Sequence, residues 1–219
     1  MKRNLLAQRA REKIVRNLCW RWIIAVLFLS SAVTGAQANT ILVLGDSLSA
    51  AYGIPREHSW VALLQEKLRQ QKLPNSNVIN AAISGDTTDG GLARLPVLLQ
   101  KHKPDIAIIE LGANDGLRGY QIQRTRDNLA QIIQLCQKAN AKVLLVGMKI
   151  PPNYGLRYTS DFYETYTLAA KRFNVPLVPF FLDGIATHPE LMQDDGLHPR
   201  AEAQPRLFEN IWKYLQPML

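Results

Sequence analysis

Four short polar motifs along the chain contain the residue types that acyl transfer needs. In chain order they are Gly45-Asp46-Ser47-Leu48, Gly85-Asp86-Thr87, Gly112-Ala113-Asn114-Asp115 and Asp195-Gly196-Leu197-His198-Pro199. A serine hydroxyl is a weak nucleophile until an imidazole takes its proton and a carboxylate orients that imidazole. We therefore predict that Ser47 is a nucleophile, His198 its general base and Asp195 the residue that orients His198.

The same chemistry needs hydrogen-bond donors around the oxygen that becomes negatively charged in the tetrahedral intermediate. We expect this oxyanion hole to consist of the backbone N–H groups of Ser47 and Gly85 and the side-chain amide of Asn114. Glycine at position 85 permits close backbone approach and unusual dihedral angles.

The elements that must position these motifs alternate between strand and helix. Apolar runs predict strands at residues 40–45, 77–82, 105–111, 143–148 and 176–180, and helical patterns lie around residues 60–68, 92–99, 128–139, 162–173 and 207–215. Runs that are apolar throughout are typical of parallel strands buried on both faces. The alternation predicts a single-domain, doubly wound α/β fold with helices on both faces of a parallel sheet.

In such a fold, ligands bind beyond the carboxyl ends of the strands, and all four motifs fall there. Each motif also has a structural interpretation, because Ser47 could cap a helix and the other three could form turns. Taken together, at one edge of the sheet, they favour catalysis.

The charge of the chain is concentrated at its beginning. Seven of the 26 basic residues and one of the 18 acidic residues precede residue 39, which leaves 19 basic and 17 acidic residues after it. This balance argues against a nucleic-acid-binding surface.

A basic start, an apolar stretch at 22–29 and the small residues Ala36-Gln37-Ala38 predict a secretory signal peptide over 1–38. We expect cleavage between Ala38 and Asn39, no stable membrane insertion afterwards, and a periplasmic or secreted protein.

Two alternatives of other classes remain open from the residues alone. A metal-dependent phosphoesterase would use carboxylates and an imidazole as ligands, from the set Asp46, Asp86, Asp115, Asp194 and His198. A non-catalytic periplasmic binding protein is the other alternative, although one domain leaves no second lobe to close over a ligand. An α/β-hydrolase is disfavoured because Ser49 stands where Gly-x-Ser-x-Gly requires glycine. Nucleotide binding is disfavoured because the glycine-rich and P-loop motifs are missing.

The four motifs resemble the sequence blocks of the GDSL, or SGNH, hydrolase family, and the resemblance covers residues 40–217. Longer stretches are similar to its branch of periplasmic thioesterases, proteases and lysophospholipases; they are residues 111–119, Pro152-Asn153-Tyr154-Gly155 and Met192-Gln193-Asp194-Asp195-Gly196. The resemblance implies a flavodoxin-like sheet ordered 2-1-3-4-5, an SGNH hydrolase domain over 39–219, and the triad and oxyanion hole named above. It also implies cleavage of fatty acyl thioesters, aryl and short-chain esters, lysophospholipids and some amino-acid esters.

We expect a monomer that acts on these small acyl substrates without a cofactor or metal. Its acyl groove must be lined by apolar loop residues near the site. Our candidates are Leu95, Pro96, Ile150, Pro151 and Tyr154.

Overall fold

Five parallel strands form the centre of the protein in the computed structural model, which describes residues 39–71 and 76–219. Along the chain the strands are β1 (Thr40–Gly45), β2 (Asn77–Asn80), β3 (Ile106–Glu110), β4 (Lys142–Val146) and β5 (Leu177–Val178). Their order in the sheet is β2-β1-β3-β4-β5 and every pairing is parallel, which confirms the predicted topology. The signal peptide predicted over 1–38 lies outside the described residues.

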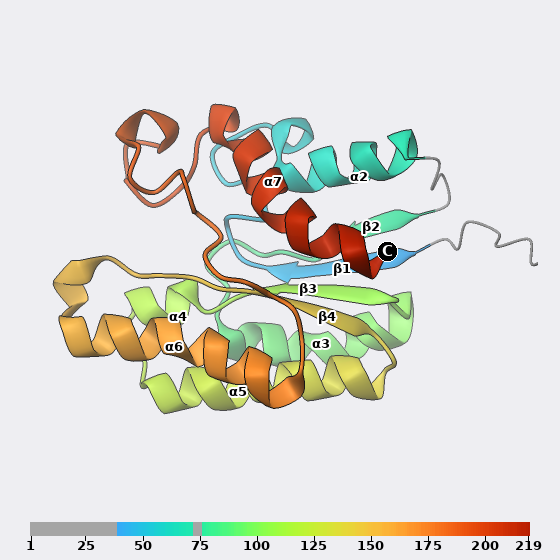
Figure 1. Cartoon of the computed structure of the whole chain (residues 1–219), viewed down its shortest axis with the longest axis horizontal. Coiled ribbons are helices and arrows are strands. Elements are labelled where there is room, and N and C mark those ends of the chain that lie inside the picture. The colour runs from blue at the N-terminus through green and yellow to red at the C-terminus, as the bar shows by residue number, and fades with distance from the viewer. Residues whose placement is uncertain (1–38, 72–75) are drawn as a thin grey trace, which may run out of the picture. The chain divides into compact units, whose positions relative to one another are not determined.

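Helices cover both faces of this sheet (Figure 1). Helices α2 (Trp60–Gln70) and α7 (Gln204–Leu215) lie on one face, and α3 (Thr88–His102), α5 (Ile122–Lys138) and α6 (Leu156–Phe173) lie on the other. A short helix α4 (Ala113–Leu117) follows β3, and within the described residues five 3-10 turns complete the helical elements: Arg56–His58, Pro152–Tyr154, Pro189–Leu191, Ala201–Ala203 and Gln216–Met218.

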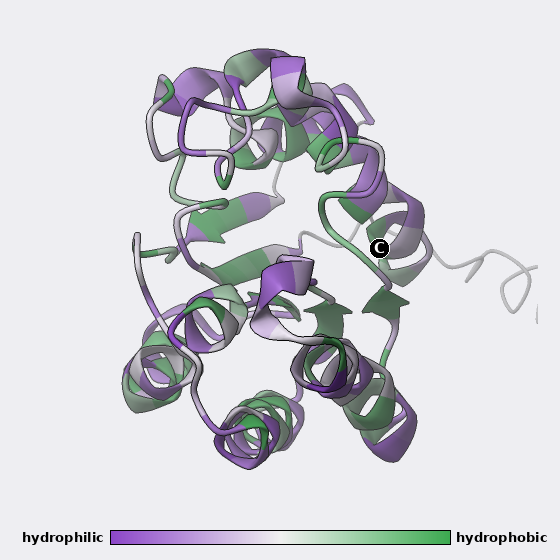
Figure 2. Ribbon diagram, turned by 90° about the vertical axis from the view of Figure 1, so that its left-hand side faces the viewer, coloured by the Kyte–Doolittle hydropathy of each residue, from purple (hydrophilic) through white to green (hydrophobic). Residues whose placement is uncertain are grey.

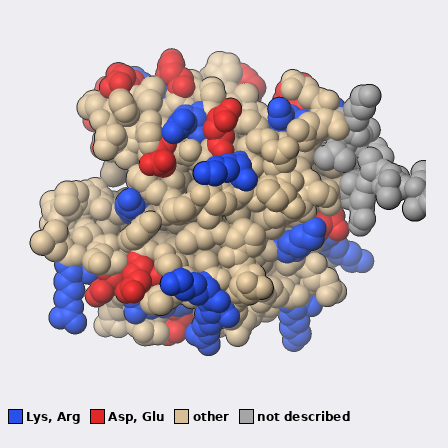
Figure 3. All heavy atoms as spheres, in the orientation of Figure 1, with Lys and Arg blue, Asp and Glu red and all other residues tan. Residues whose placement is uncertain are grey.

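The core lies between the sheet and its helices because the central strands are mostly apolar and buried. All five residues of β3 are buried, as are residues 41–45 of β1. The end-on view shows hydrophobic strands enclosed by helices whose polar faces point outwards (Figure 2). On the surface shown in Figure 3, acidic and basic side chains are interspersed.

Four strands are shorter than predicted, and one of them, β4, covers Lys142–Val146 instead of 143–148. β5 spans only Leu177 and Val178 because Pro176 and Pro179 flank it and have no backbone N–H to donate. β2 ends at Asn80, whose side chain accepts a hydrogen bond from the Ala82 backbone N–H and so turns the chain locally. β3 ends at Glu110 and its last predicted residue, Leu111, leads into the α4 turn.

Candidate active site

The turn after β1 presents Ser47 at the carboxyl edge of the sheet. Asp46 caps this turn: its Oδ1 accepts from the Leu48 backbone N–H at 3.0 Å, and its carbonyl accepts from Ala50 N at 2.9 Å. The capped turn places Ser47 in a half-buried position where its hydroxyl meets the loop that follows β5.

Ser47, His198 and Asp195 form a continuous chain of hydrogen bonds. Ser47 Oγ lies 2.8 Å from His198 Nε2, and His198 Nδ1 lies 2.6 Å from Asp195 Oδ2. The other carboxylate oxygen of Asp195 accepts from the backbone N–H groups of Leu197 at 2.9 Å and His198 at 3.0 Å. Partial burial disfavours the charged form of Asp195, but these hydrogen bonds outweigh it and lower its pKa to about 2. Asp195 is therefore ionised at neutral pH and can hold the imidazole with Nε2 facing the serine.

The loop that carries Asp195 and His198 is fastened to the rest of the site by Gln193. Its backbone N–H donates to the His198 carbonyl at 2.7 Å. Its side-chain amide donates to the carbonyls of Tyr52 at 2.9 Å and Pro199 at 3.1 Å. The ring of Tyr52 also lies against the imidazole, with ring centroids 4.4 Å apart. These contacts join the triad loop to the segment that follows the serine.

Asn114, at the start of α4, points its side-chain amide towards the same edge. Gly112 allows this because its positive φ of 113° turns the chain between β3 and α4. The Asn114 Nδ2 donates to Asp46 Oδ2 at 3.1 Å and to the Asp86 carbonyl at 2.9 Å. Asn114 thus connects the serine turn to the loop that follows β2 and carries Gly85.

Gly85 lies in that loop with a positive φ of 77°, a conformation that glycine adopts without strain. Its carbonyl accepts from Arg118 Nη2 at 2.9 Å. The structure therefore brings all the triad residues and both of the loops predicted for the oxyanion hole to one edge of the sheet.

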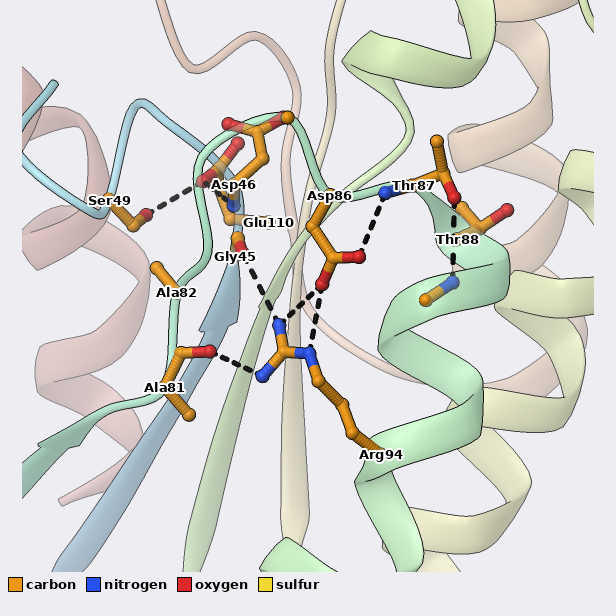
Figure 4. A network of polar contacts seen from close by, with 12 residues as sticks. Gly45, Asp46, Ser49, Ala81, Ala82, Asp86, Thr87, Thr88, Arg94 and Glu110 are labelled. Atoms are coloured by element: carbon orange, nitrogen blue, oxygen red, sulfur yellow. Dashed lines mark hydrogen bonds and ion pairs between the residues drawn. The ribbon is translucent and has the colours of Figure 1, made fainter.

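A partly buried arginine of α3, which the sequence reasoning did not single out, holds this loop in place (Figure 4). Arg94 pairs with the Asp86 carboxylate at 2.7 Å, donates to the carbonyl of Ala81 and lies 3.4 Å from that of Gly45. It therefore fastens the Gly85 loop to the ends of both β2 and β1.

A mainly apolar cavity of about 120 Å³ opens beside Ser47 and His198. Its wall includes the predicted residues Ile150 and Pro151, and further apolar side chains come from Leu117, Met148, Leu182 and Leu197. The sequence reasoning did not select these four, which come from four different segments. Tyr154 is not part of the wall, although its hydroxyl donates to the Leu117 carbonyl at 2.8 Å and so supports it.

Two of the predicted groove residues do not line this cavity. Leu95 and Pro96 lie within α3 rather than on a loop, and helical geometry turns their side chains in different directions. Leu95 is fully buried in the core and Pro96 is exposed. Their placement in the acyl groove is therefore corrected.

The carboxylates considered as metal ligands bind separate protein donors. Asp86 pairs with Arg94 and Asp194 with Arg200, while Asp115 accepts from the Thr88 hydroxyl and backbone N–H. Across residues 39–71 and 76–219, no group of three or more His, Cys, Asp or Glu side chains is arranged to hold a metal ion. The geometry favours the serine mechanism over the phosphoesterase alternative.

Comparison with known proteins agrees with this geometry. The sequence profile of the GDSL-like lipase/acylhydrolase family matches residues 43–205. The esterase TesA of Pseudomonas aeruginosa is 50% identical over 84% of this chain and 91% of its own length. The thioesterase 1/protease 1/lysophospholipase L1 of Escherichia coli is 46% identical over 93% of this chain and 96% of its own length.

A solved structure shares the fold. The psychrotrophic esterase EstA from Pseudoalteromonas, in a form inhibited by monoethylphosphonate, superimposes with a TM-score of 0.77 at 43% identity, covering 82% of this chain and 97% of that one. The family match at residues 43–205 includes the serine turn and the loop with Asp195 and His198. The chain therefore belongs to the GDSL-like lipase/acylhydrolase family and is an acyl-ester hydrolase.

Proposed function

We propose that the protein cleaves acyl esters and thioesters through a covalent acyl-enzyme formed on Ser47. His198 Nε2 takes the proton of the Ser47 hydroxyl as its oxygen attacks the acyl carbonyl carbon. The imidazolium then gives this proton to the departing alcohol or thiol, and Asp195 stabilises the positive charge in between. Water, activated by the same imidazole, releases the acid and restores the serine.

The observation that carries this proposal is the continuous contact from Ser47 Oγ through both nitrogens of His198 to Asp195, with distances of 2.8 and 2.6 Å. The backbone N–H groups of Ser47 and Gly85 and the Asn114 amide are proposed to bind the oxyanion. The proposed reaction requires no metal or cofactor.

The apolar cavity beside Ser47 is proposed to receive the acyl chain, with Ile150 and Pro151 in its wall. The names of the relatives support a substrate range that includes aryl esters, acyl thioesters and lysophospholipids. The phosphonate-inhibited esterase relative supports a serine nucleophile.

Labelling by a fluorophosphonate tests the nucleophile directly. We expect metal-free turnover of a p-nitrophenyl ester in the presence of a chelator, and a single covalent adduct on Ser47 by mass spectrometry. Ser47→Ala should abolish both, whereas Ser84→Ala, in the exposed turn before Gly85, should retain them. A label on Ser84 or Ser49, or turnover that the chelator stops, would refute the assignment.

We also propose that residues 1–38 are removed on export and that the mature protein, a monomer, begins at Asn39. Within the described residues, no helix is long and apolar enough to cross a membrane. N-terminal sequencing of protein from a periplasmic extract should return Asn39 first, and sedimentation should give the mass of one chain. Recovery of the protein in a membrane fraction with its basic N-terminus intact would mean that residues 1–38 anchor the protein and are not removed.

A further inference from the structure

The carboxyl group of Glu110 is buried directly behind the turn that carries Ser47. Glu110 is the last residue of β3 and pairs in register with Gly45, the last residue of β1. It has no exposed surface, and none of the ion pairs among the described residues includes it. An ionised carboxylate in such a position would lack a compensating cation, which is costly in a protein interior.

The two oxygens of Glu110 have different surroundings. Oε2 accepts from the Ser49 hydroxyl at 2.7 Å and from the Asp46 backbone N–H at 3.2 Å. Oε1 is buried and receives no hydrogen bond from any donor in the described part of the chain. Protonation would satisfy this oxygen, because Oε1 would then donate its own hydrogen to a neighbouring acceptor.

The group that could accept this hydrogen is the carboxylate of Asp46. Asp46 is 1% exposed, and its backbone N–H donates to Glu110 Oε2 at 3.2 Å, so the two carboxyl groups lie close together. Two ionised carboxylates repel each other at this range, whereas a carboxylic acid and a carboxylate attract each other through a hydrogen bond.

We propose that Asp46 and Glu110 hold one proton between them, carried by Glu110, and that the pair acts as a single buried anion that orients the Asn114 amide. Asp46 is the member that touches Asn114, with Oδ2 accepting from Nδ2 at 3.1 Å. Glu110 is therefore a positioning residue that acts through Asp46. The second half of this inference rests on the oxyanion role proposed above for Asn114.

The environment of the two carboxyls explains why the proton resides on Glu110. Burial, and then the neighbouring Asp46 charge, raise the pKa of Glu110 well above its usual value. Burial raises the pKa of Asp46 only to about 6, because the Leu48 backbone N–H and the charge of His198 favour its ionised form. The carboxylate nearer to the catalytic groups is thus the one that keeps the negative charge.

Charged and titratable groups on the surrounding elements favour a single charge on the pair. Asp86, from the loop after β2, adds negative potential at Asp46. Tyr166 of α6 is fully buried, and burial, followed by the nearby charge of Asp115, raises its pKa well above its usual value, so it remains neutral. The Arg94 guanidinium of α3 is already held by Asp86, and the His198 imidazole is already held by Asp195. A second negative charge on the pair would have no partner of its own.

Infrared difference spectroscopy on the full-length Ser47→Ala protein tests the shared proton without using activity. At neutral pH we expect the carbonyl stretch of a buried protonated carboxylic acid, which Glu110→Gln in the same background should remove. Glu66→Gln is the matched control, because Glu66 is exposed and pairs with Arg69 on α2, so it should leave the band unchanged. Absence of the band in the parent protein would overturn the proposal.

Activity of two substitutions at Glu110 tests the positioning role. Glutamine keeps a donor for Asp46 and an acceptor for Ser49, whereas methionine has similar length and neither group. We expect Glu110→Met to lower kcat by about tenfold or more with KM changed by less than about twofold, and Glu110→Gln to recover most of the loss. Equal impairment in both variants would overturn the role of the shared proton.

The infrared result remains decisive if the methionine variant does not fold. The experiments also distinguish failure of the shared-proton proposal from failure of the oxyanion role proposed for Asn114. If Asn114→Ala were fully active while the band persisted, the oxyanion assignment would fall and the shared proton would stand. If the band were absent while Asn114→Ala was inactive, only the shared proton would fall.

Discussion

Arg94 binds Asp86 through two nitrogens at once, with Nε 2.9 Å and Nη2 2.7 Å from the same carboxylate oxygen (Figure 4). The pair is largely buried, with side-chain exposures of 21% and 10%. Since the Asp86 carbonyl also accepts from Asn114, the position of Asp86 affects two of the three donors of the proposed oxyanion hole, Gly85 and Asn114.

Arg94→Lys should therefore lower kcat by roughly tenfold with little change in KM, because a lysine cannot reproduce this fork of planar donors. Steady-state kinetics with a p-nitrophenyl ester would measure the effect. Arg124→Lys is the matched control, because Arg124 forms a more exposed ion pair with Asp89 and should lose little activity. A loss confined to KM would assign Arg94 to substrate binding instead.

Substitution of Asn114 tests the oxyanion hole. Asn114→Ala should lower kcat by roughly 10² to 10³, or about 2.7 to 4 kcal/mol, because its amide would bind an oxygen that becomes charged only in the transition state. Asn114→Asp should be at least as damaging, since a carboxylate opposes the developing negative charge. A fall in melting temperature large enough to explain the lost activity would instead assign Asn114 to the structure of its loop.

Asp195→Asn should lower kcat by roughly 10³ to 10⁴, because an amide cannot favour the imidazolium or hold the required tautomer. The control is Asp194→Asn at the neighbouring position, whose side chain is 97% exposed and pairs with Arg200. Its kcat should stay within about twofold of the parent. Comparable losses at both positions would indicate a disturbed loop and not a catalytic carboxylate.

Asp195 should also contribute to stability in a pH-dependent way. Its pKa is lowered to about 2 in the folded protein, below the value of about 3.9 for an unfolded chain. The ionised carboxylate therefore stabilises the fold above about pH 4, and this contribution is lost as the pH falls towards 2. Thermal unfolding of the parent and Asp195→Asn should differ most at pH 6 and converge near pH 2. A difference that does not change with pH would contradict the depressed pKa.

Chain-length selectivity tests the apolar cavity. Each methylene buried there should contribute up to about 0.8 kcal/mol, so kcat/KM should rise with acyl length and level off once the cavity is full. Ile150→Ala should flatten this rise while sparing acetyl esters, because Ile150 lines the cavity wall. Leu156→Ala is the control, since Leu156 is 85% exposed on α6. Equal losses on short and long substrates would mean that Ile150 serves folding.

Most of the strands and the four motifs could be predicted from the residues because both are local patterns, whereas the strand order 2-1-3-4-5 was implied by the family resemblance. Five apolar runs define the strands, and each motif directly follows a strand or precedes the last helix. Helix α4 was not predicted, because its residues Ala113–Leu117 include Asn, Asp and Gly, which are weak helix formers. Its formation depends on the turn at Gly112 and on its surroundings in the fold.

The supporting network was harder to foresee because it depends on contacts between distant segments. Arg94 lies in a helical pattern where an exposed arginine is the ordinary expectation. Glu110 did leave a signal, since it is the one charged residue in the otherwise apolar strand β3. A charge within a buried strand implies a partner, but the sequence does not say that the partner is Asp46. Leu95 was misplaced for a related reason, because apolarity alone does not distinguish a core side chain from a groove wall.

Ser47 and His198 are 151 positions apart in the chain, which affects when the site can assemble during protein synthesis. Synthesis proceeds from the N-terminus, so the strand and turn that present the serine are made well before the loop that carries the imidazole. That loop is followed by α7, whose side chains Leu207 and Ile211 are buried in the core. A nascent chain thus has the serine before it has the proposed general base, and the Ser47–His198 contact can form only after residue 198 has been synthesised.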